Sequence, residues 1–443
     1  PLLRGGPGDV RRRLDPEAGR APPDEVLEQV AVVAGQLDHQ AVRAQVAPLY
    51  ELLHVFLRVL QQVVRIGGEI RVVLAEQDLG GHGLVDLQQT AIGTEDDPQG
   101  IGGLGLGELR LADGETLWIQ DFDMAPERGG EVELDAVRLL VEEAFRRILA
   151  GETDNDGFNH LVIAAHMHWR QVKMLRAYCK YLQQANIPFS AAYMAEAVAR
   201  HPGMSRILVE LFEAKFDPAR DSESKALREE AQKGLHELLT AIFADDCGAD
   251  PVLGEYLQEL IAVRTGSREQ QIAAARKAFR RGLQFVTSLD EDRILHAFYE
   301  VIEATLRTSF YQRDAAGEVR EYIAFKIDSQ ALPELPRPRP YREIWVYSAR
   351  FEGVHLRGGA IARGGLRWSD RKEDFRTEVL GLMKAQNVKN TMIVPVGAKG
   401  GFVVKQPPAE GGREAYFAAG VSCYKKFISG LLDITDNLVE EKI

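Results

Sequence analysis

RGGLRWSD at residues 363–370 and KNTMIVPVGAKGGF at residues 389–402 are the two segments that decide the fold of this chain. Between them lies a helical pattern with Phe375, Val379, Leu382 and Met383 on its inner side. Asp370 and Glu373 fit an N-cap and its partner at the start of that helix. Strands are predicted on both sides of the helix, at 353–357 and 390–394, and a further one follows at 402–405. This alternation predicts an α/β domain.

The same two segments bring cations together with glycines. Gly364 and Gly365 allow the backbone to approach a ligand closely, and several cations with an amide around them suit a small ligand with two carboxylates. The candidate ligand-binding residues are Arg363, Arg367, Gln386, Lys389 and Lys399. Lys399 lies in a tight glycine loop, where positive neighbours would lower its pKa and make it a candidate acid–base group. The spacing is equally compatible with solvated surface charges on a glycine-rich turn.

The middle of the chain is predicted to be helical. Apolar stripes with a helical period cover 134–149, 169–184, 190–200, 205–216, 222–243, 267–283 and 289–306. Pro202-Gly203 is expected to end one helix, and Ser288-Leu289-Asp290-Glu291 forms a capping box for another. After Tyr311 the period changes to two, with strands predicted at 321–327 and 343–348. The proline-rich run 335–340 marks a boundary.

Residues 1–114 have an unusual composition. The first Met is Met124 and the first Lys is Lys173, and Ser, Asn and Cys are absent from the first 120 positions. Two explanations remain open, a biased N-terminal region from a GC-rich genome or the translation of a wrong frame joined to a coding region, and we favour the second. The glycine run 100–107 lacks the strand and helix of a dinucleotide-binding loop. We expect poor order here.

The composition narrows the class of function. The chain has 443 residues and a net charge of −12, which argues against binding to nucleic acids or anionic membranes. Cys179, Cys247 and Cys423 are scattered and fit reduced thiols in a cytoplasmic protein. No apolar stretch is long enough for a membrane span. We expect no metal site, because His166 and His168 do not share a helix face.

The run RGGLRWSDRKEDFRTEVLGLMKAQNVKNTMIVPVGAKGGFVVK, at 363–405, resembles the large bacterial NAD-specific glutamate dehydrogenases. It is similar, more distantly, to the smaller glutamate dehydrogenases. The fragments NDGFNHLV (155–162), LRAYCKYLQQ (175–184), RILVELFEAKFDP (206–218), SLDEDRIL (288–295) and PRPYREIWVYS (338–348) are similar to the middle region of the large family. The resemblance covers about 115–443 and does not extend to the first 114 residues.

This resemblance implies the oxidative deamination of L-glutamate to 2-oxoglutarate and ammonia, with NAD as cofactor. Lys399 matches the catalytic lysine of the GAKGG segment, which activates water and polarises the developing carbonyl. Gln386 and Lys389 match the residues that bind the substrate α-carboxylate. Arg363, before Gly364 and Gly365, stands where the smaller enzymes carry a lysine that binds the side-chain carboxylate, and the segment between Lys389 and Lys399 is two residues shorter than theirs.

The resemblance also implies a domain order and a fold class of α+β and α/β parts. We expect a poorly ordered 1–114, the end of an ACT-like α/β domain at 115–130, a helical region at 131–310, and the substrate-binding half of a dehydrogenase catalytic domain at 311–443. The family's catalytic aspartate and its NAD-binding Rossmann domain are expected beyond Ile443, so NAD would be bound mainly outside this chain, which we expect to be inactive alone.

The full-length protein is expected to be a cytoplasmic homo-oligomer whose partner is its small-molecule substrate. The alternative is a helical regulatory or interaction module whose cationic loop binds a dicarboxylate without catalysis.

Overall fold

A computed structural model describes residues 84–91, 105–111, 116–121, 134–222, 225–242, 266–389, 396–408 and 410–435. The chain divides into two compact units, Pro1–Glu142 and Glu143–Ile443. In the first unit, β1 (Leu84–Ala91), β2 (Gly105–Leu111) and β3 (Thr116–Asp121) pair as an antiparallel sheet. Strand β3 lies in the part that we expected to be the end of an α/β domain, and the other two strands lie within the segment for which we expected poor order.

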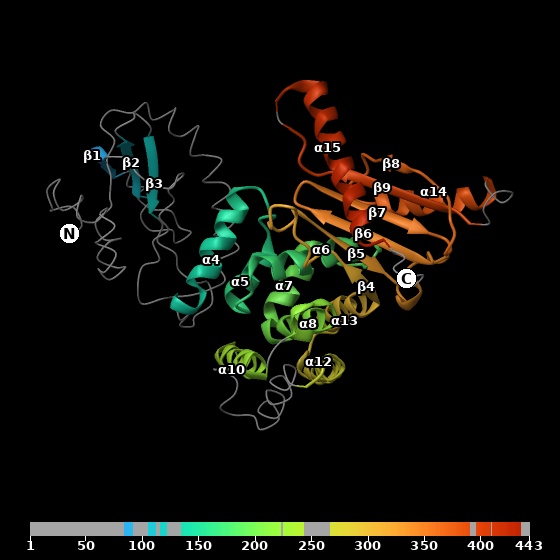
Figure 1. Ribbon diagram of the computed structural model, residues 1–443, viewed down its shortest axis with the longest axis horizontal. Coiled ribbons are helices and arrows are strands. Elements are labelled where there is room, and N and C mark those ends of the chain that lie inside the picture. The colour runs from blue at the N-terminus through green and yellow to red at the C-terminus, as the bar shows by residue number, and fades with distance from the viewer. Residues whose placement is uncertain are drawn as a thin grey trace. The chain divides into compact units, whose positions relative to one another are not determined.

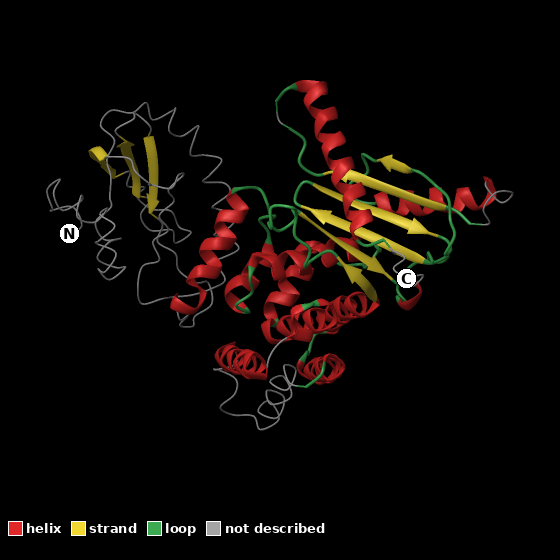
Figure 2. Cartoon of the chain, viewed as in Figure 1, coloured by secondary structure: helices red, strands yellow, loops and turns green. Residues whose placement is uncertain are grey.

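The second unit contains the helices that the apolar stripes predict, shown in red in Figure 2. α4 (Leu134–Leu149) begins in the first unit and ends in the second. The others are α5 (His160–Ala164), α6 (Trp169–Gln184), α7 (Ala191–Arg200), α8 (Pro202–Phe216), α9 (Ala219–Ser222), α10 (Lys225–Ile242), α12 (Arg268–Gly282) and α13 (Leu289–Ala304). No helix among the described residues combines the length and apolarity needed to cross a membrane.

A mixed sheet of six strands follows, in the order β4-β5-β6-β7-β9-β8 among the described residues. Each pair from β4 to β7 is antiparallel, as is the pair of β7 with β9, whereas β8 runs parallel to β9 at the edge. The bounds are β4 (Thr305–Thr308), β5 (Tyr322–Ile327), β6 (Arg342–Ser348), β7 (Phe351–Arg357), β8 (Leu366–Trp368) and β9 (Ala398–Val404). This sheet supports the expected helical region followed by an α/β part.

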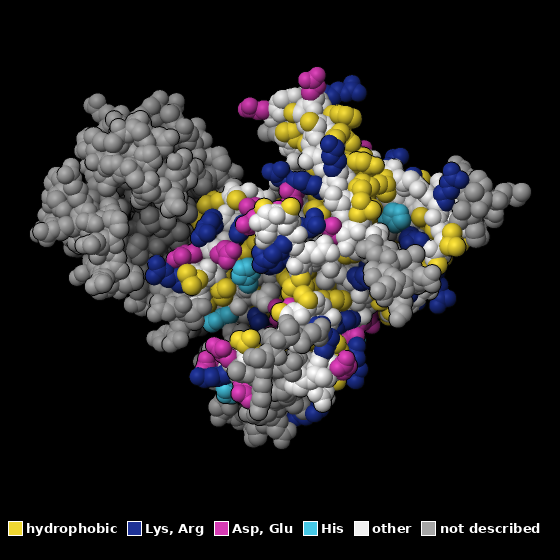
Figure 3. Space-filling model, in the orientation of Figure 1, with side chains coloured by type: hydrophobic (Ala, Val, Ile, Leu, Met, Phe, Trp, Pro, Cys, Tyr) yellow, Lys and Arg dark blue, Asp and Glu magenta, His cyan; other side chains and the backbone are white. Residues whose placement is uncertain are grey.

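Helices cover the two faces of this sheet (Figure 1). α15 (Gly412–Asp433) packs on one face, with Phe427 in an apolar cluster with Phe402 and Val346. α15 also leaves part of Tyr416, Phe417, Val421 and Tyr424 exposed, and hydrophobic side chains, in yellow, lie along this helix in Figure 3. The opposite face carries α14 (Phe375–Lys389), which contacts β7 and β9, and α6, which contacts β6.

The helical region thus supplies part of the cover of the sheet. The indole Nε1 of Trp345 on β6 donates to the Ala177 carbonyl on α6 at 3.0 Å. Its ring also stacks on Phe375 of α14, with centroids 5.8 Å apart. The domain boundary that we predicted near residue 310 remains a prediction, and α6 and the sheet share one core across it.

A buried polar cluster connects α6 to the segment that precedes α5, residues 153–159. Arg176 is fully buried and makes bonds of 2.8 to 2.9 Å to both carboxylate oxygens of Asp156. Its remaining donors reach Thr153 and Asn159 at 2.8 Å. The carboxylate and the burial act in opposite directions on the guanidinium, and its pKa is raised overall. One arginine therefore ties the segment 153–159 to α6.

Several predicted boundaries are wrong, for local reasons. Pro202 opens α8 instead of ending a helix, since its missing N–H costs nothing in a first turn. The stripe at 289–306 predicts too long a helix: α13 stops at Ala304, and Leu306 lies on β4 with 44% of its surface exposed. Ser288 caps α13 as predicted, but the Glu291 carboxylate binds Arg200 and His201, so the capping box is half formed.

Candidate functional site

The site forms where β8 and β9 run side by side. The amide of Ala398 donates to the Arg363 carbonyl at 2.8 Å, and the amide of Gly400 donates to the Gly365 carbonyl at 3.1 Å. A parallel bridge also joins Arg363 to Gly397. The glycine pair and the lysine segment, separated by more than thirty positions in the sequence, are therefore adjacent strands. Strand β8 was not predicted, because it has three residues and no measurable alternation.

Gly364 is required by this pairing. A Cβ built on Gly364 would lie 1.4 Å from the Ala398 carbonyl oxygen, a distance that no side chain can tolerate. We predicted that the glycine pair lets the backbone approach a ligand; at Gly364 the backbone approaches β9 instead. A Cβ on Gly365 would lie 4.0 Å from the Lys399 Nζ, so this second glycine leaves the space beside the lysine amine open.

Lys399 is the second residue of β9, so it lies in a strand and not in the loop that the glycines predicted. Its neighbour on β7 is Leu356, which is fully buried. Two residues along β9, a Cβ on Gly401 would meet Val379 of α14 at 2.5 Å, so Lys399 points to the face that α14 covers. Lys399 is partly buried, and within the described ranges no carboxylate lies within 4.0 Å of its amine.

The two arginines around the glycine pair differ. Arg363 is exposed, and no carboxylate of the described residues pairs with it. The Arg367 Nε lies 2.6 Å from the Glu378 carboxylate on α14. Glu378 also accepts from the Ser369 hydroxyl at 2.6 Å. Arg367, one of the candidate ligand-binding cations, is therefore neutralised within the fold, whereas Arg363 and Lys399 retain uncompensated charge.

Gln386 and Lys389 lie in the last turn of α14, three residues apart as the sequence indicates. Because α14 packs on β7 and β9, this turn belongs to the same face of the sheet as Lys399. Gln386 is partly buried. The segment 390–395, with the strand predicted at 390–394, lies outside the described residues.

The start of α14 differs from the prediction. Asp370 and Glu373 do not cap it; the helix begins at Phe375, and Ser369 Oγ accepts from the Arg371 amide at 3.1 Å. Gln184 at the end of α6 provides the polar partners of the first turn instead. Sequence reasoning missed Gln184, because its partners lie about 190 residues away and no local pattern marks them.

Three further titratable side chains near the site had no sequence signal. Glu343 on β6 and Arg376 on α14 form an ion pair in which neither side chain is exposed. His355 on β7 lies opposite Gly400, on the other face of the sheet from Lys399. Its burial, with a contribution from Arg357, lowers the pKa of the imidazole to about 4. His355 is therefore neutral at physiological pH.

A metal is not suggested by the histidines that the sequence singled out. His168 caps α6, its Nδ1 accepting from the Arg170 amide at 3.3 Å, and its Nε2 lies 3.0 Å from Glu143. In the described ranges no group of three His, Cys, Asp or Glu side chains could hold a metal ion.

Two family models match the chain. Residues 278–443 match "Bacterial NAD-glutamate dehydrogenase, catalytic domain", and residues 153–218 match "Glutamate dehydrogenase, helical motif 3". The first covers the whole six-stranded sheet, α14 and α15, and the second covers α5 to α8. Both the helical region and the α/β part therefore have counterparts in one family of proteins.

The chain is also similar to curated proteins named NAD-specific glutamate dehydrogenase. It is 45% identical to that of Pseudomonas aeruginosa over 335 residues, 76% of this chain and 18% of the relative. It is 43% identical to that of Mycobacterium tuberculosis over 337 residues, 74% of this chain and 18% of the relative. The Neurospora crassa protein is 29% identical over 159 residues. The chain thus spans less than a fifth of the length of these bacterial relatives.

Proposed function

The chain belongs to the bacterial NAD-specific glutamate dehydrogenase family, and we propose from this that it forms the glutamate-binding part of such an enzyme. The reaction is the oxidative deamination of L-glutamate to 2-oxoglutarate and ammonia. The observation that carries the proposal is the β8–β9 pair, in which Lys399 and Arg363 lie together without any carboxylate partner among the described residues. Uncompensated cations at a partly buried strand edge favour a dianionic ligand.

Each site residue then has a separate role. Arg363 binds the side-chain carboxylate of glutamate, and the last turn of α14, with Gln386 and Lys389, binds the α-carboxylate. This leaves the α-carbon near Lys399, with the open space over Gly365 beside it. The Lys399 ammonium donates a hydrogen bond to the oxygen that develops on that carbon and, as the free amine, accepts a proton from the attacking water.

NAD, when bound, accepts the hydride from the α-carbon of glutamate. In the described part of the chain no strand, glycine-rich turn and helix follow one another as a dinucleotide site requires. We therefore propose that this chain binds the dicarboxylate and that another part of the enzyme holds NAD. We infer further that the chain alone does not turn glutamate over.

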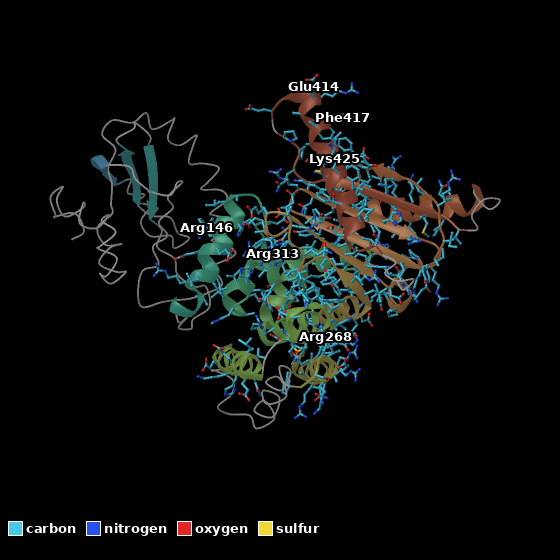
Figure 4. All side chains as sticks on the ribbon, in the orientation of Figure 1. Arg146, Arg268, Arg313, Glu414, Phe417 and Lys425 are labelled. Carbon is cyan, nitrogen blue, oxygen red and sulfur yellow. The ribbon has the colours of Figure 1, made fainter. Side chains whose placement is uncertain are left out.

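Calorimetric titration with 2-oxoglutarate tests the binding site. Lys399→Met should weaken binding by about 10-fold to 100-fold, the loss expected for one charge-assisted hydrogen bond. Lys425→Met is the matched control, because Lys425 is exposed on α15, which covers the other face of the sheet (Figure 4). Equal affinities of wild type and Lys399→Met would contradict the site.

A turnover assay separates the enzyme from a regulatory module that merely binds a dicarboxylate. The chain is supplied with the C-terminal part of the Pseudomonas aeruginosa relative, and NADH oxidation is followed with 2-oxoglutarate and ammonium. We expect activity in the combined protein, none in the chain alone, and none after Lys399→Met. Tight dicarboxylate binding without activity in the combined protein would favour the regulatory module.

A further inference from the structure

Gln184, the last residue of α6, is bonded to the beginning of α14. Its side-chain oxygen accepts from the Arg376 amide at 3.1 Å, and its side-chain nitrogen donates to the carbonyls of Lys372 and Glu373 at 2.9 and 3.0 Å. Only 5% of Gln184 is exposed. One carboxamide from the helical region therefore makes hydrogen bonds both to a backbone amide in the first turn of α14 and to the carbonyls that precede this turn.

The other contacts that fix α14 lie close to this point. Phe375 stacks on Trp345, Arg376 pairs with Glu343, and Glu378 pairs with Arg367, all within the first four residues of the helix. The proposed ligand-binding residues Gln386 and Lys389 lie at its opposite end. Because a helix rises about 1.5 Å per residue, a tilt of about 5° at Arg376 would displace the backbone of Lys389 by roughly 1.7 Å.

We propose that Gln184 is a positioning residue for the substrate site. It sets the direction of α14 and thereby the placement of Gln386 and Lys389 relative to Lys399 on β9. The helical region thus contributes to substrate binding, because it supplies the side chain that orients α14 and with it the last turn, which binds the α-carboxylate. This inference rests on the proposed function of that turn.

Gln184→Met tests the proposal, since methionine keeps the length and bulk of glutamine and removes all three hydrogen bonds. Gln171→Met is the matched control. Gln171 lies on the same helix, but its amide nitrogen donates to Glu213 at 2.6 Å, within the helical region. Binding of 2-oxoglutarate is measured by calorimetry, and amide hydrogen exchange is followed over 375–389 and over the sheet.

We expect Gln184→Met to weaken 2-oxoglutarate binding by tenfold or more and to accelerate exchange in α14. Gln171→Met should lower thermal stability, because Gln171 completes the capping box of α6, yet keep the affinity within about twofold of wild type. If wild type and Gln184→Met bind 2-oxoglutarate with equal affinity, the inference is overturned and the proposed function stands. Absence of binding to wild type would overturn the proposed function, and this inference with it.

Gln184→Glu adds a pH-dependent readout that a general loss of packing does not produce. Ionised glutamate would accept from the Arg376 amide but oppose the carbonyls of Lys372 and Glu373, whereas protonated glutamate can donate to one of them. The ratio of its dissociation constant to that of wild type should therefore decrease as the pH falls from 8 to about 5, a range in which a buried carboxyl group can become protonated. A ratio that does not change with pH would overturn the inference.

Discussion

The guanidinium of Arg376 on α14 holds the carboxylate of Glu343 on β6 with two bonds, of 2.5 and 2.8 Å, and neither side chain is exposed. The hydroxyl of Tyr181 on α6 lies 3.3 Å from the same carboxylate. Glu343 on β6 therefore contacts both α6 of the helical region and α14. Burial and the carboxylate act in opposite directions on the guanidinium of Arg376, and its pKa is raised overall, so this group stays charged at physiological pH.

Removing one member of this pair should be more damaging than removing both. Glu343→Leu leaves a buried guanidinium without a countercharge, Arg376→Leu leaves a buried carboxylate without one, and we expect each to lose about 3–5 kcal/mol in the free energy of unfolding. The double variant Glu343→Leu with Arg376→Leu should lose less than either single variant, because no buried charge remains. Urea denaturation of the four proteins gives the comparison. Additive losses in the double variant would show that the two charges act independently.

Gly364→Ala should separate β8 from β9. The added methyl group would meet the Ala398 carbonyl, and since the methyl is fixed to the Gly364 backbone and the carbonyl belongs to the backbone of β9, the two segments must move apart. We expect a loss of about 2–4 kcal/mol, as for a severe overpacking, and loss of 2-oxoglutarate binding. Gly381→Ala is the control, because Gly381 is exposed on α14 with no neighbouring atom within 4 Å of an added methyl group, and alanine should stabilise the helix by up to about 1 kcal/mol.

Arg363 and Arg367 should separate binding from stability. Arg363→Met removes an exposed cation without a carboxylate partner among the described residues, so 2-oxoglutarate affinity should fall about tenfold while the melting temperature stays unchanged. Arg367→Met removes the partner of Glu378, with about half of the arginine side chain exposed, and should cost less than about 1 kcal/mol of stability with a smaller effect on affinity. The opposite ranking of affinities would assign the ligand to Arg367.

The helices were predictable from the sequence because their apolar stripes are long and local. Helices α4 and α6 begin and end where the periodicity indicates, at Leu134–Leu149 and Trp169–Gln184. The cap of α14 was not predictable. Ser369-Asp370 with Glu373 has the local form of a cap, but the Ser369 hydroxyl turns to Glu378, and Gln184 arrives from another helix.

The candidate site was predictable in its residues and not in its geometry. The motif around Gly364 and the lysine segment carried a strong resemblance to one family, and residues 278–443 match its catalytic domain. The parallel pairing of β8 and β9 depends on contacts across more than thirty residues, which periodicity does not encode. The neutralisation of Arg367 likewise depends on Glu378. Counting the cationic residues in the sequence therefore gave too many candidates for binding the ligand.

Acid should weaken the fold through His355. Its pKa is lowered by burial and by Arg357 from 6.5 to about 4, so the unfolded chain binds a proton between these values that the folded chain does not. The contribution to stability is present above pH 6.5 and lost as the pH falls toward 4, by roughly 3 kcal/mol at most. In urea titrations, the stability difference between wild type and His355→Gln should shrink by that amount across this range, and a constant difference would contradict the prediction.

Lys173 on α6 should produce a pH dependence of the same origin at the alkaline end. Lys173 is 2% exposed, and its amine donates to the carbonyls of Glu152 and Glu321 at 2.9 and 2.8 Å. Burial lowers its pKa from 10.5 to about 8, although Asp154 opposes the shift. Between these values the unfolded chain binds the additional proton, so the folded state gains stability as the pH rises through this window.

The comparison of wild type with Lys173→Met isolates this effect, since tyrosines and other lysines titrate in both proteins. The difference in unfolding free energy should move in favour of wild type by up to about 3 kcal/mol between pH 8 and pH 10.5. If the difference between wild type and Lys173→Met stays constant over this range, the buried amine titrates as it does in the unfolded chain, and its two carbonyl partners hold the proton against the cost of burial.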